Sequence, residues 1–317
     1  MTAFFKTHLG LVLSMICITL LWSSAGVISR QMTAAQGWEL TFWRSAFTAV
    51  FVAAYWLYSR RWLGVKADVS AGVWFWVSAL CWAIMFTCFM LAMSFTSVGH
   101  VLLTMSVGPL LTAVFARLFF KQTIAHYTWL AALCVGAGLA YMFGADLFGT
   151  RSGASLEQAA ANHSRAVSGM LIAFCVPIAG AFNFVVLQHA AKQRLNINLM
   201  PAVCVGAVLS SLACLAIIGL VMAQPLLATT KDLAWLAALG LFQLAIPCVW
   251  VVWVSARLPA AEVSLLQILE IIFGTTWAWL WANETPSSAT LWGGSFVVAV
   301  LLANAAWGLQ LNRNPKS

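Results

Sequence analysis

Residues 260–281 read AAEVSLLQILEIIFGTTWAWLW, an apolar run of about 20 residues with the carboxyl group of Glu270 near its middle. A helix rises about 1.5 Å per residue, so this run matches the ~30 Å hydrocarbon core of a bilayer. A run of this length predicts a transmembrane helix, and Glu270 then falls close to the midplane of the membrane.

Similar runs recur along the whole chain, separated by short polar stretches. The predicted spans are 9–29, 39–58, 72–95, 97–120, 124–144, 166–190, 199–222, 232–255, 260–281 and 289–309. Hydrocarbon admits only helices and closed barrels, and these runs are continuous rather than alternating in hydrophobicity. The sequence therefore predicts an all-α membrane protein with ten transmembrane helices.

The composition agrees with this fold class. Hydrophobic residues make up 63% of the 317 positions, charged residues make up 8%, and the mean hydropathy is +0.93. Soluble proteins carry roughly 25% charged residues. The formal charge of +8 does not predict nucleic-acid binding, because the basic residues sit in the short loops between apolar runs.

The basic residues also orient the chain. Ten spans place both termini on one side, and the residues on that side are Lys6, Arg60, Arg61, Lys66, Arg117, Lys121, Lys192, Arg194, Arg257, Arg313 and Lys316. Only Arg30, Arg151, Arg165 and Lys231 fall on the other side. The positive-inside rule then predicts a bacterial inner-membrane protein with N-in and C-in topology, whose first run is a retained helix rather than a signal peptide.

The eight cysteines lie within apolar runs and form no CxxC pair, which argues against a disulfide framework or a metal site. A phosphate-binding loop, an HExxH sequence and a nucleophile elbow are also absent from the sequence. We therefore expect no enzymatic activity, no metal and no cofactor, and transport that is secondary or facilitated rather than driven by ATP.

The chain divides into two similar halves. Residues 1–144 form a first five-helix repeat, residues 145–165 an extracytoplasmic linker, and residues 166–317 a second five-helix repeat. Ser97-Val98-Gly99-His100 aligns with Pro259-Ala260-Ala261-Glu262, and both lead into an apolar span. Five spans per half is an odd number, so the second repeat is inverted, as in alternating-access transporters.

These features are similar to the EamA-type members of the drug/metabolite transporter superfamily. The first half carries Trp22-Ser23-Ser24, the stretch Trp38–Arg44, the stretch Met90–Ser97 and the stretch Val107–Ala113. The second half carries the stretch Ala256–Glu262, Leu269-Glu270, Asn283-Glu284 and Gly293-Gly294. The chain departs from the family pattern at Lys121-Gln122, at Ile271 and in the length of its linker. The resemblance covers essentially the whole chain.

From the resemblance and the repeats we expect a secondary or facilitative transporter, an exporter of small organic metabolites such as amino acids or their derivatives. The alternatives are a nucleotide-sugar or cationic-drug carrier, or a membrane protein that does not transport. The expected partners are a small-molecule substrate and the lipid bilayer, with protons as a candidate coupling ion and no nucleic acid. The protein would be a monomer or a homodimer.

Two ionisable residues at membrane depth are the main candidates for the substrate or coupling site. Burying a charge there costs roughly 2.5–3.5 kcal/mol, so such groups normally face a cavity or a partner. Glu270 would carry a proton or bind a cation, and Arg44 would hold a substrate carboxylate. The alternatives are that the two pair with each other, or that Arg44 reaches the outer headgroups.

Further candidates are polar or aromatic side chains within the spans, each of which could equally serve packing. The expected cavity-lining residues are Trp22, Ser23, Asn183, Gln243, Trp250 and Gln267. His100 is the repeat equivalent of Glu262 and is included as a site candidate. Pro109 is a predicted helix break, which would free a backbone carbonyl toward a cavity.

The predicted topology can be tested by single-cysteine labelling in a cysteine-free background. An impermeant reagent applied to whole cells should leave positions 59–68 and the C-terminal tail unlabelled, and should label positions 150–164. Labelling of the tail from outside would contradict both the span count and the inversion of the second half.

Overall fold

A computed structural model of the chain describes residues 7–35, 37–63, 72–120, 130–131, 133–138, 141, 156–192, 199–223, 225–226, 228–281 and 288–313. Within these ranges every regular element is helical. The first half contains α1 (His8–Ser23), α2 (Ala25–Ser29), α3 (Trp38–Leu63), α4 (Val73–Phe95), α5 (Val98–Met105) and α6 (Gly108–Phe120). The second contains α8 (Leu156–Lys192), α9 (Met200–Ala216), the π-helix η2 (Ile217–Met222), α10 (Thr230–Ala238), the π-helix η3 (Leu239–Ala245), α11 (Ile246–Ser255), α12 (Ala260–Leu266), α13 (Ile268–Trp281) and α14 (Ser288–Arg313).

The all-α membrane fold predicted from the sequence is confirmed. In the described part of the chain, eight helical stretches are long and apolar enough to cross a membrane, and Leu291–Val300 forms a shorter apolar helix within α14. The expected span 124–144 lies largely outside the described residues. Helix α8 begins at Leu156, well before the predicted start of the sixth span at residue 166, so part of the expected linker 145–165 is helical.

Local sequence explains where several helices begin. Ser97 caps α5 by accepting a hydrogen bond from the backbone N–H of His100 at 3.3 Å. Thr229 and Asp232 form a reciprocal capping box at the start of α10, which satisfies backbone N–H groups that the first turn leaves without partners. Both helices start at a polar step between apolar runs, as the hydropathy pattern predicts.

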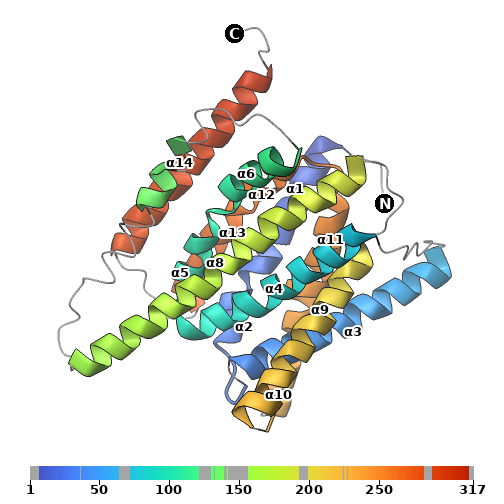
Figure 1. The fold of residues 1–317 in the computed structure, drawn as a ribbon, viewed down its shortest axis with the longest axis vertical. Helices are drawn as coiled ribbons and strands as arrows, with labels where there is room; N and C mark the ends of the chain where they lie inside the picture. Colours follow the sequence, from blue (N-terminus) through green and yellow to red (C-terminus); the bar gives the residue numbers. More distant parts are fainter. Residues whose placement is uncertain are drawn as a thin grey trace.

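Asp232 also ties the loop after α2 to the start of α10. Its carboxylate accepts hydrogen bonds from the backbone N–H groups of Thr33, Ala34 and Ala35 at 2.9–3.3 Å. The loop lies at the end of the molecule where α3 and α10 begin (Figure 1). One buried carboxylate therefore holds two connecting segments together, the loop after α2 from the first half and the start of α10 from the second.

The two halves interleave rather than forming separate bundles. Helix α4 packs along α8 and α9, and α1 packs along α11 and α13. Exchanging each span for its equivalent in the other half converts the α4–α8 contact into the α11–α1 contact, and the α4–α9 contact into the η3–α3 contact. In Figure 1, α4 and the helical stretch formed by α10, η3 and α11 run in opposite directions.

The fourth and ninth spans are each broken at the same repeat position. Helix α5 ends at Met105, and α12 ends just before Gln267, which is the residue equivalent to Met105 when Ser97 is set against Pro259. Both breaks are followed at once by a second helix, α6 or α13. Two discontinuous helices in equivalent positions, in contact with each other through α5 and α13, lie at the interface of the halves.

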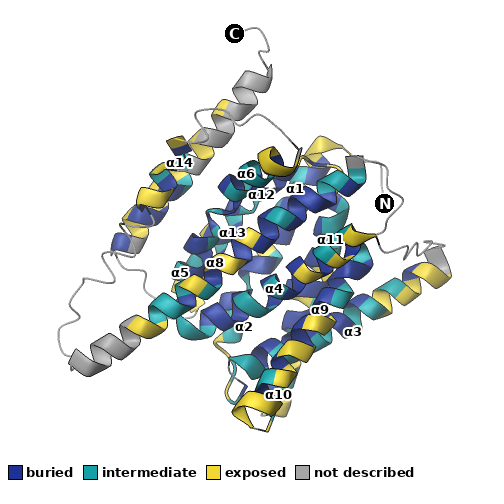
Figure 2. Ribbon diagram, viewed as in Figure 1, coloured by how far each residue is buried: buried dark blue, intermediate teal, exposed yellow. Residues whose placement is uncertain are grey.

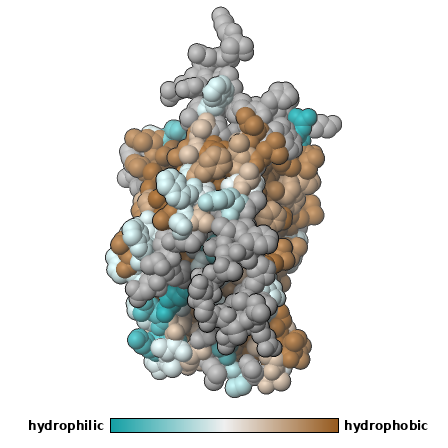
Figure 3. All heavy atoms as spheres, turned by 90° about the vertical axis from the view of Figure 1, so that its left-hand side faces the viewer, coloured by the Kyte–Doolittle hydropathy of each residue, from teal (hydrophilic) through white to brown (hydrophobic). Residues whose placement is uncertain are grey.

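The outer faces of the helix bundle expose large apolar side chains, as expected for a surface in contact with lipid tails. Examples are Leu118, Leu171 and Leu212, each more than half exposed. Exposed residues lie on the outward sides of the helices and buried ones between them (Figure 2). Hydrophobic atoms dominate much of the described surface on the face shown in Figure 3.

A close helix contact brings α9 against α4 at Gly206. A Cβ atom at this position would lie 2.5 Å from the Cβ of Trp82 and 2.7 Å from the carbonyl oxygen of Ala79. Backbones approach this closely only over small residues, which membrane helices use to pack without a hydrophobic driving force. By contrast, a Cβ atom on Gly219 would meet nothing within 4 Å.

Replacing Gly206 with alanine should therefore separate α4 from α9 and destabilise the protein by about 1–3 kcal/mol, the usual cost of overpacking. The Gly219→Ala variant is the matched control, and its stability should stay within about 0.5 kcal/mol of the wild type. Thermal unfolding of the purified variants in one detergent measures both. Equal melting temperatures for Gly206→Ala and the wild type would contradict this packing.

Candidate functional site

A small cavity lies where the two halves meet, and residues of both halves line it. We call it the central cavity. Its lining residues are Trp22, Arg44, Trp82, Met85, Phe86, Phe89, Met105, Val176, Gln243, Leu244, Cys248, Gln267 and Glu270. Five of these were predicted site residues, namely Trp22, Arg44, Gln243, Gln267 and Glu270. The structure thus brings together side chains that are far apart in the sequence.

Arg44 of α3 is the most buried charged side chain of the cavity, with 0% of its surface exposed. Its Nη1 donates to Oε1 of Gln243 at 3.0 Å, and its Nη2 donates to the carbonyl oxygen of Phe86 at 2.7 Å. The guanidinium carbon also lies 5.9 Å from the centre of the Phe89 ring. Of the alternatives considered for this residue, extension to the headgroups is excluded because the side chain points into the protein.

Gln243 connects Arg44 to the first span. It lies on the π-helix η3, and its Nε2 donates to the carbonyl oxygen of Trp22 at 3.5 Å. Thr48 joins η3 to α3, since its hydroxyl lies 2.8 Å from the carbonyl oxygen of Arg44 and 3.2 Å from that of Gly240. π-Helical turns often occur at functional sites because they re-aim side chains. Here the π-turn carries the amide that accepts from Arg44.

Glu270 lies directly after the break in the ninth span. Its backbone N–H donates to the carbonyl oxygen of Gln267 at 2.9 Å, and the side chains of both residues line the central cavity. The side chain is 4% exposed and sits in the first turn of α13, where the helix dipole favours a negative charge. Among the described residues Glu270 forms no ion pair with Arg44, so the structure does not show the pairing of these two groups that the sequence left open.

Two buried N–H donors, on residues that line the central cavity, have no hydrogen-bond partner in the described part of the chain. These are Nε of Arg44 and Nε1 of Trp82. Leaving a buried donor unsatisfied costs about 1–3 kcal/mol. The residues that line the cavity thus include two with unpartnered buried N–H groups, together with the acidic residue Glu270.

The central cavity is small in this conformation, about 40 Å³. A water molecule needs roughly 10–15 Å³ of such space, so the cavity admits water but no organic metabolite. A second space of about 10 Å³ adjoins Glu270 and is lined by Ser106 and Pro109 from the broken fourth span. Binding of a larger molecule requires the helices around these breaks to move apart.

Two more predicted site residues, Pro109 and Ser23, are outside the central cavity. One lines the second space and the other contacts α13. Pro109 is in the first turn of α6, directly after the break at Ser106 and Val107, and lines the space beside Glu270. Ser23 does not line the central cavity. Its hydroxyl accepts a hydrogen bond from Nε1 of Trp277 at 3.1 Å, which joins the end of α1 to α13.

The remaining three predicted residues lie elsewhere. The Oδ1 atom of Asn183 accepts a hydrogen bond from Ser78 at 2.7 Å, between α8 and α4. Nδ1 of His100 lies 2.9 Å from the hydroxyl of Ser97, at the start of α5. Trp250 lines a separate groove on the other side of η3. The sequence could not separate these residues from the cavity set, because all are polar or aromatic groups within apolar runs.

Trp82 and the backbone carbonyl of Phe86 are not among the residues predicted from the sequence. Both come from a span without any charged residue, so the sequence offers no local signal for them. The structure also contains a cluster of three hydroxyl groups, in which Ser210 of α9 lies 3.0 Å from Ser45 of α3 and 2.8 Å from Thr87 of α4. This cluster joins three helices close to Arg44 along α3.

Comparisons with known proteins decide the family. The model of the EamA-like transporter family matches residues 9–144 and 167–305. This chain belongs to the EamA-like transporter family. It is thus a multi-pass membrane protein of a transporter family, and the family resemblance seen in the sequence is confirmed.

Individual relatives are distant. The chain is 24% identical over 203 residues to the uncharacterized transporter YdfC of Bacillus subtilis (strain 168), an alignment that covers 64% of this chain and 60% of that protein. A solved crystal structure matches 98% of this chain and 100% of its own, with a TM-score of 0.62 and 17% identity. At that identity the match shows a shared fold and nothing about the substrate.

The link between Arg44 and Gln243 can be tested by stability alone. Gln243→Leu removes the acceptor at Nη1 and leaves a buried cation with one fewer hydrogen bond, so the variant should be less stable by about 1–3 kcal/mol. Gln188→Leu, a half-buried position on α8 that does not line the cavity, should change stability little. Thermal unfolding in detergent measures both, and equal stability of the two variants would show that Gln243 does not hold Arg44.

Proposed function

We propose that this EamA-family protein exports small zwitterionic metabolites, amino acids or their derivatives, across the bacterial inner membrane. One observation carries the proposal: the central cavity holds one basic and one acidic side chain, both buried, without an ion pair between them. Burying two opposite charges apart from each other at membrane depth costs free energy, unless a ligand gives each charge a partner of the opposite sign.

A zwitterion supplies both missing partners. Its carboxylate would accept hydrogen bonds from Nε of Arg44 and Nε1 of Trp82, the two donors that lack partners in the cavity. Its ammonium group would lie against the carboxyl group of Glu270. Because Arg44 is held by Gln243 and by the carbonyl of Phe86, its orientation is fixed before the ligand arrives.

Movement of the substrate follows from the broken spans. The breaks at Ser106–Val107 and at Gln267 interrupt one span of each half, and Ser106 and Gln267 line the same small space as Glu270. These breaks would act as the joints of the carrier. In the conformation described here the cavity is too small for a metabolite, which fits an occluded state. Opening one joint or the other would expose the same site to opposite sides of the membrane, as in alternating access.

Glu270 also suits proton coupling. When no ammonium group is present, a proton on its carboxyl group would remove the buried charge and allow the empty carrier to change conformation. Substrate binding on the inside would then displace the proton into the cytoplasm. After the substrate leaves on the outside, another proton would bind from there, so the inward movement of protons would drive export. The N-in and C-in orientation predicted from the basic residues belongs to this proposal.

The second candidate is a carrier of cationic drugs. The aromatic wall formed by Trp22, Trp82, Phe86 and Phe89, together with Glu270, would suit an organic cation without a carboxylate. Such a carrier would leave Arg44 without a role in binding. The two candidates therefore differ in whether the ligand needs a carboxylate.

The substrate class can be tested with the purified protein. Thermal unfolding is measured with each of the common amino acids, since a ligand that binds only the folded state raises the melting temperature. The best binder is then compared in proteoliposome counterflow with its matching amine, which lacks the carboxylate, and its matching hydroxy acid, which lacks the ammonium group. We expect the amino acid alone to accumulate. Accumulation of the amine to the same level would favour the cationic-drug carrier, and a screen without any stabilising amino acid would overturn the proposal.

The Glu270→Gln variant tests proton coupling in the same vesicles. It keeps the shape of the side chain and cannot release a proton, so transport by the variant should lose the pH dependence that the wild type shows between about pH 5.5 and 8. Exchange should persist with a higher KM, because the ammonium group of the substrate loses its charged partner. Glu262→Gln is the matched control, because Glu262 lies outside the cavity and pairs with His8 at 2.8 Å. If the wild type itself shows no pH dependence in this range, Glu270 binds substrate without moving protons.

A further inference from the structure

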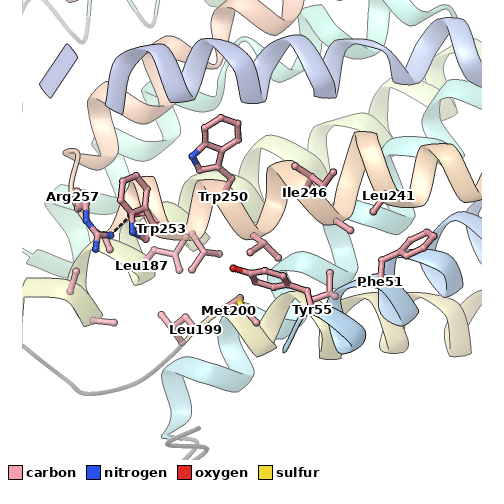
Figure 4. A pocket seen from close by; sticks show the side chains of 17 residues that line it. Phe51, Tyr55, Leu187, Leu199, Met200, Leu241, Ile246, Trp250, Trp253 and Arg257 are labelled. Atoms are coloured by element: carbon pink, nitrogen blue, oxygen red, sulfur yellow. Dashed lines mark hydrogen bonds between the residues drawn. The ribbon is translucent and has the colours of Figure 1, made fainter. Parts of the chain in front are cut away.

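A second, larger cavity lies on the outer side of the helix bundle, separate from the central cavity. We call it the lateral groove. It has a volume of about 560 Å³ and is walled by α3, α8, α9, η3 and α11. Figure 4 shows the side chains that line it, among them Phe51, Tyr55, Leu241, Trp250 and Trp253. Its size lies within the roughly 300–1,000 Å³ range of ligand sites.

The lateral groove opens toward the surface that faces lipid. Tyr55 and Ile246 line it and are 46% and 40% exposed, whereas Leu199 and Val52 on its inner wall are buried. In a bilayer such an opening is in contact with acyl chains. Water cannot fill an apolar groove at this depth at low cost, so hydrocarbon is its natural occupant.

One end of the groove is polar and positively charged. Arg257, directly after α11, is exposed and is the one charged residue among those lining the groove. Its guanidinium lies 4.1 Å from the centre of the Trp253 ring and donates one hydrogen bond to the Trp253 carbonyl at 2.7 Å. In Figure 4 Arg257 and Trp253 lie at one end of the groove, and Phe51 and Leu241 at the other.

This pattern matches the two ends of a phospholipid. A tryptophan ring and an arginine at the end of a membrane helix lie at headgroup level, and a basic residue there attracts anionic lipid by about 1 kcal/mol, or about fivefold in affinity. The remainder of the groove, from Trp250 to Phe51, is apolar and runs along the helices. We propose that the lateral groove binds one acyl chain of an anionic phospholipid whose headgroup phosphate meets Arg257.

The groove and the central cavity share one wall. Leu241 and Ala245 of η3 line the groove, while Gln243 and Leu244 of the same π-helix line the central cavity. A chain in the groove would therefore pack directly behind the residue that holds Arg44. The bound lipid supports this π-turn from the outside, which gives the groove a consequence for the transport site.

Native mass spectrometry of the purified protein with equal amounts of phosphatidylglycerol and phosphatidylethanolamine tests the proposal. The wild type should retain one tightly bound lipid, with about fivefold preference for phosphatidylglycerol. Val249→Trp fills the groove and should lower the retained lipid about tenfold or more. Leu212→Trp, on the exposed face of α9 outside the groove, is its control and should retain lipid as the wild type does.

The headgroup contact is tested with a matched pair of arginines. Arg257→Gln should retain a lipid and lose the preference for phosphatidylglycerol. Arg60→Gln is the control, because Arg60 is also exposed and stacks on the tryptophan four residues earlier, Trp56, at 5.1 Å, yet does not line the groove. A wild type that retains no lipid, a Val249→Trp variant that retains as much as the wild type, or an equal loss of preference in both arginine variants would overturn the proposal.

Discussion

Arg44 is a guanidinium with no exposed surface at membrane depth, and much of the architecture around it serves to keep it there. The cost of such a group is met only if its donors find acceptors inside the protein. Phe86 offers its carbonyl, and Gln243 offers an amide oxygen from the second half of the chain. The amide reaches this position because η3 is wound as a π-helix, and Thr48 fastens that segment to α3.

This arrangement makes the two halves depend on each other. Arg44 belongs to the first half and Gln243 to the second, and the helices that carry them are packed among helices of the opposite half. The same exchange places the breaks of the fourth and ninth spans next to each other, around Glu270. Close packing is provided at positions such as Gly206, where no side chain separates α9 from α4. Close helix contacts thus surround the breaks in the fourth and ninth spans. A carrier of this kind could open at the breaks while the rest of the fold stays packed.

The π-helix η3 has a second face, toward the lipid-exposed groove that ends at Arg257. A segment with hydrogen bonds between residues five apart is less regular than an α-helix, and packing from both sides helps to keep it in place. The buried amide of Gln243 provides support on the inner side. On the outer side Leu241 and Ala245 of the same segment line the groove, so the groove and the central cavity share one stretch of backbone.

The sequence by itself determined the fold class and the two principal charges. Apolar runs of bilayer length leave helices as the solution, and an arginine and a glutamate inside such runs are rare enough to identify from composition alone. Gln243, Gln267 and Trp22 line the central cavity, whereas Asn183 and Trp250, equally plausible in the sequence, lie elsewhere. Hydropathy gives the depth of a residue but not the direction in which its side chain points around the helix. The packing of the helical segments sets that direction. It also sets the π-turn at η3, the partners of Arg44 and the separation of Arg44 from Glu270. Only the tertiary structure decides them, because the acceptors for a buried charge come from residues as distant as Phe86 and Gln243, which no local pattern connects.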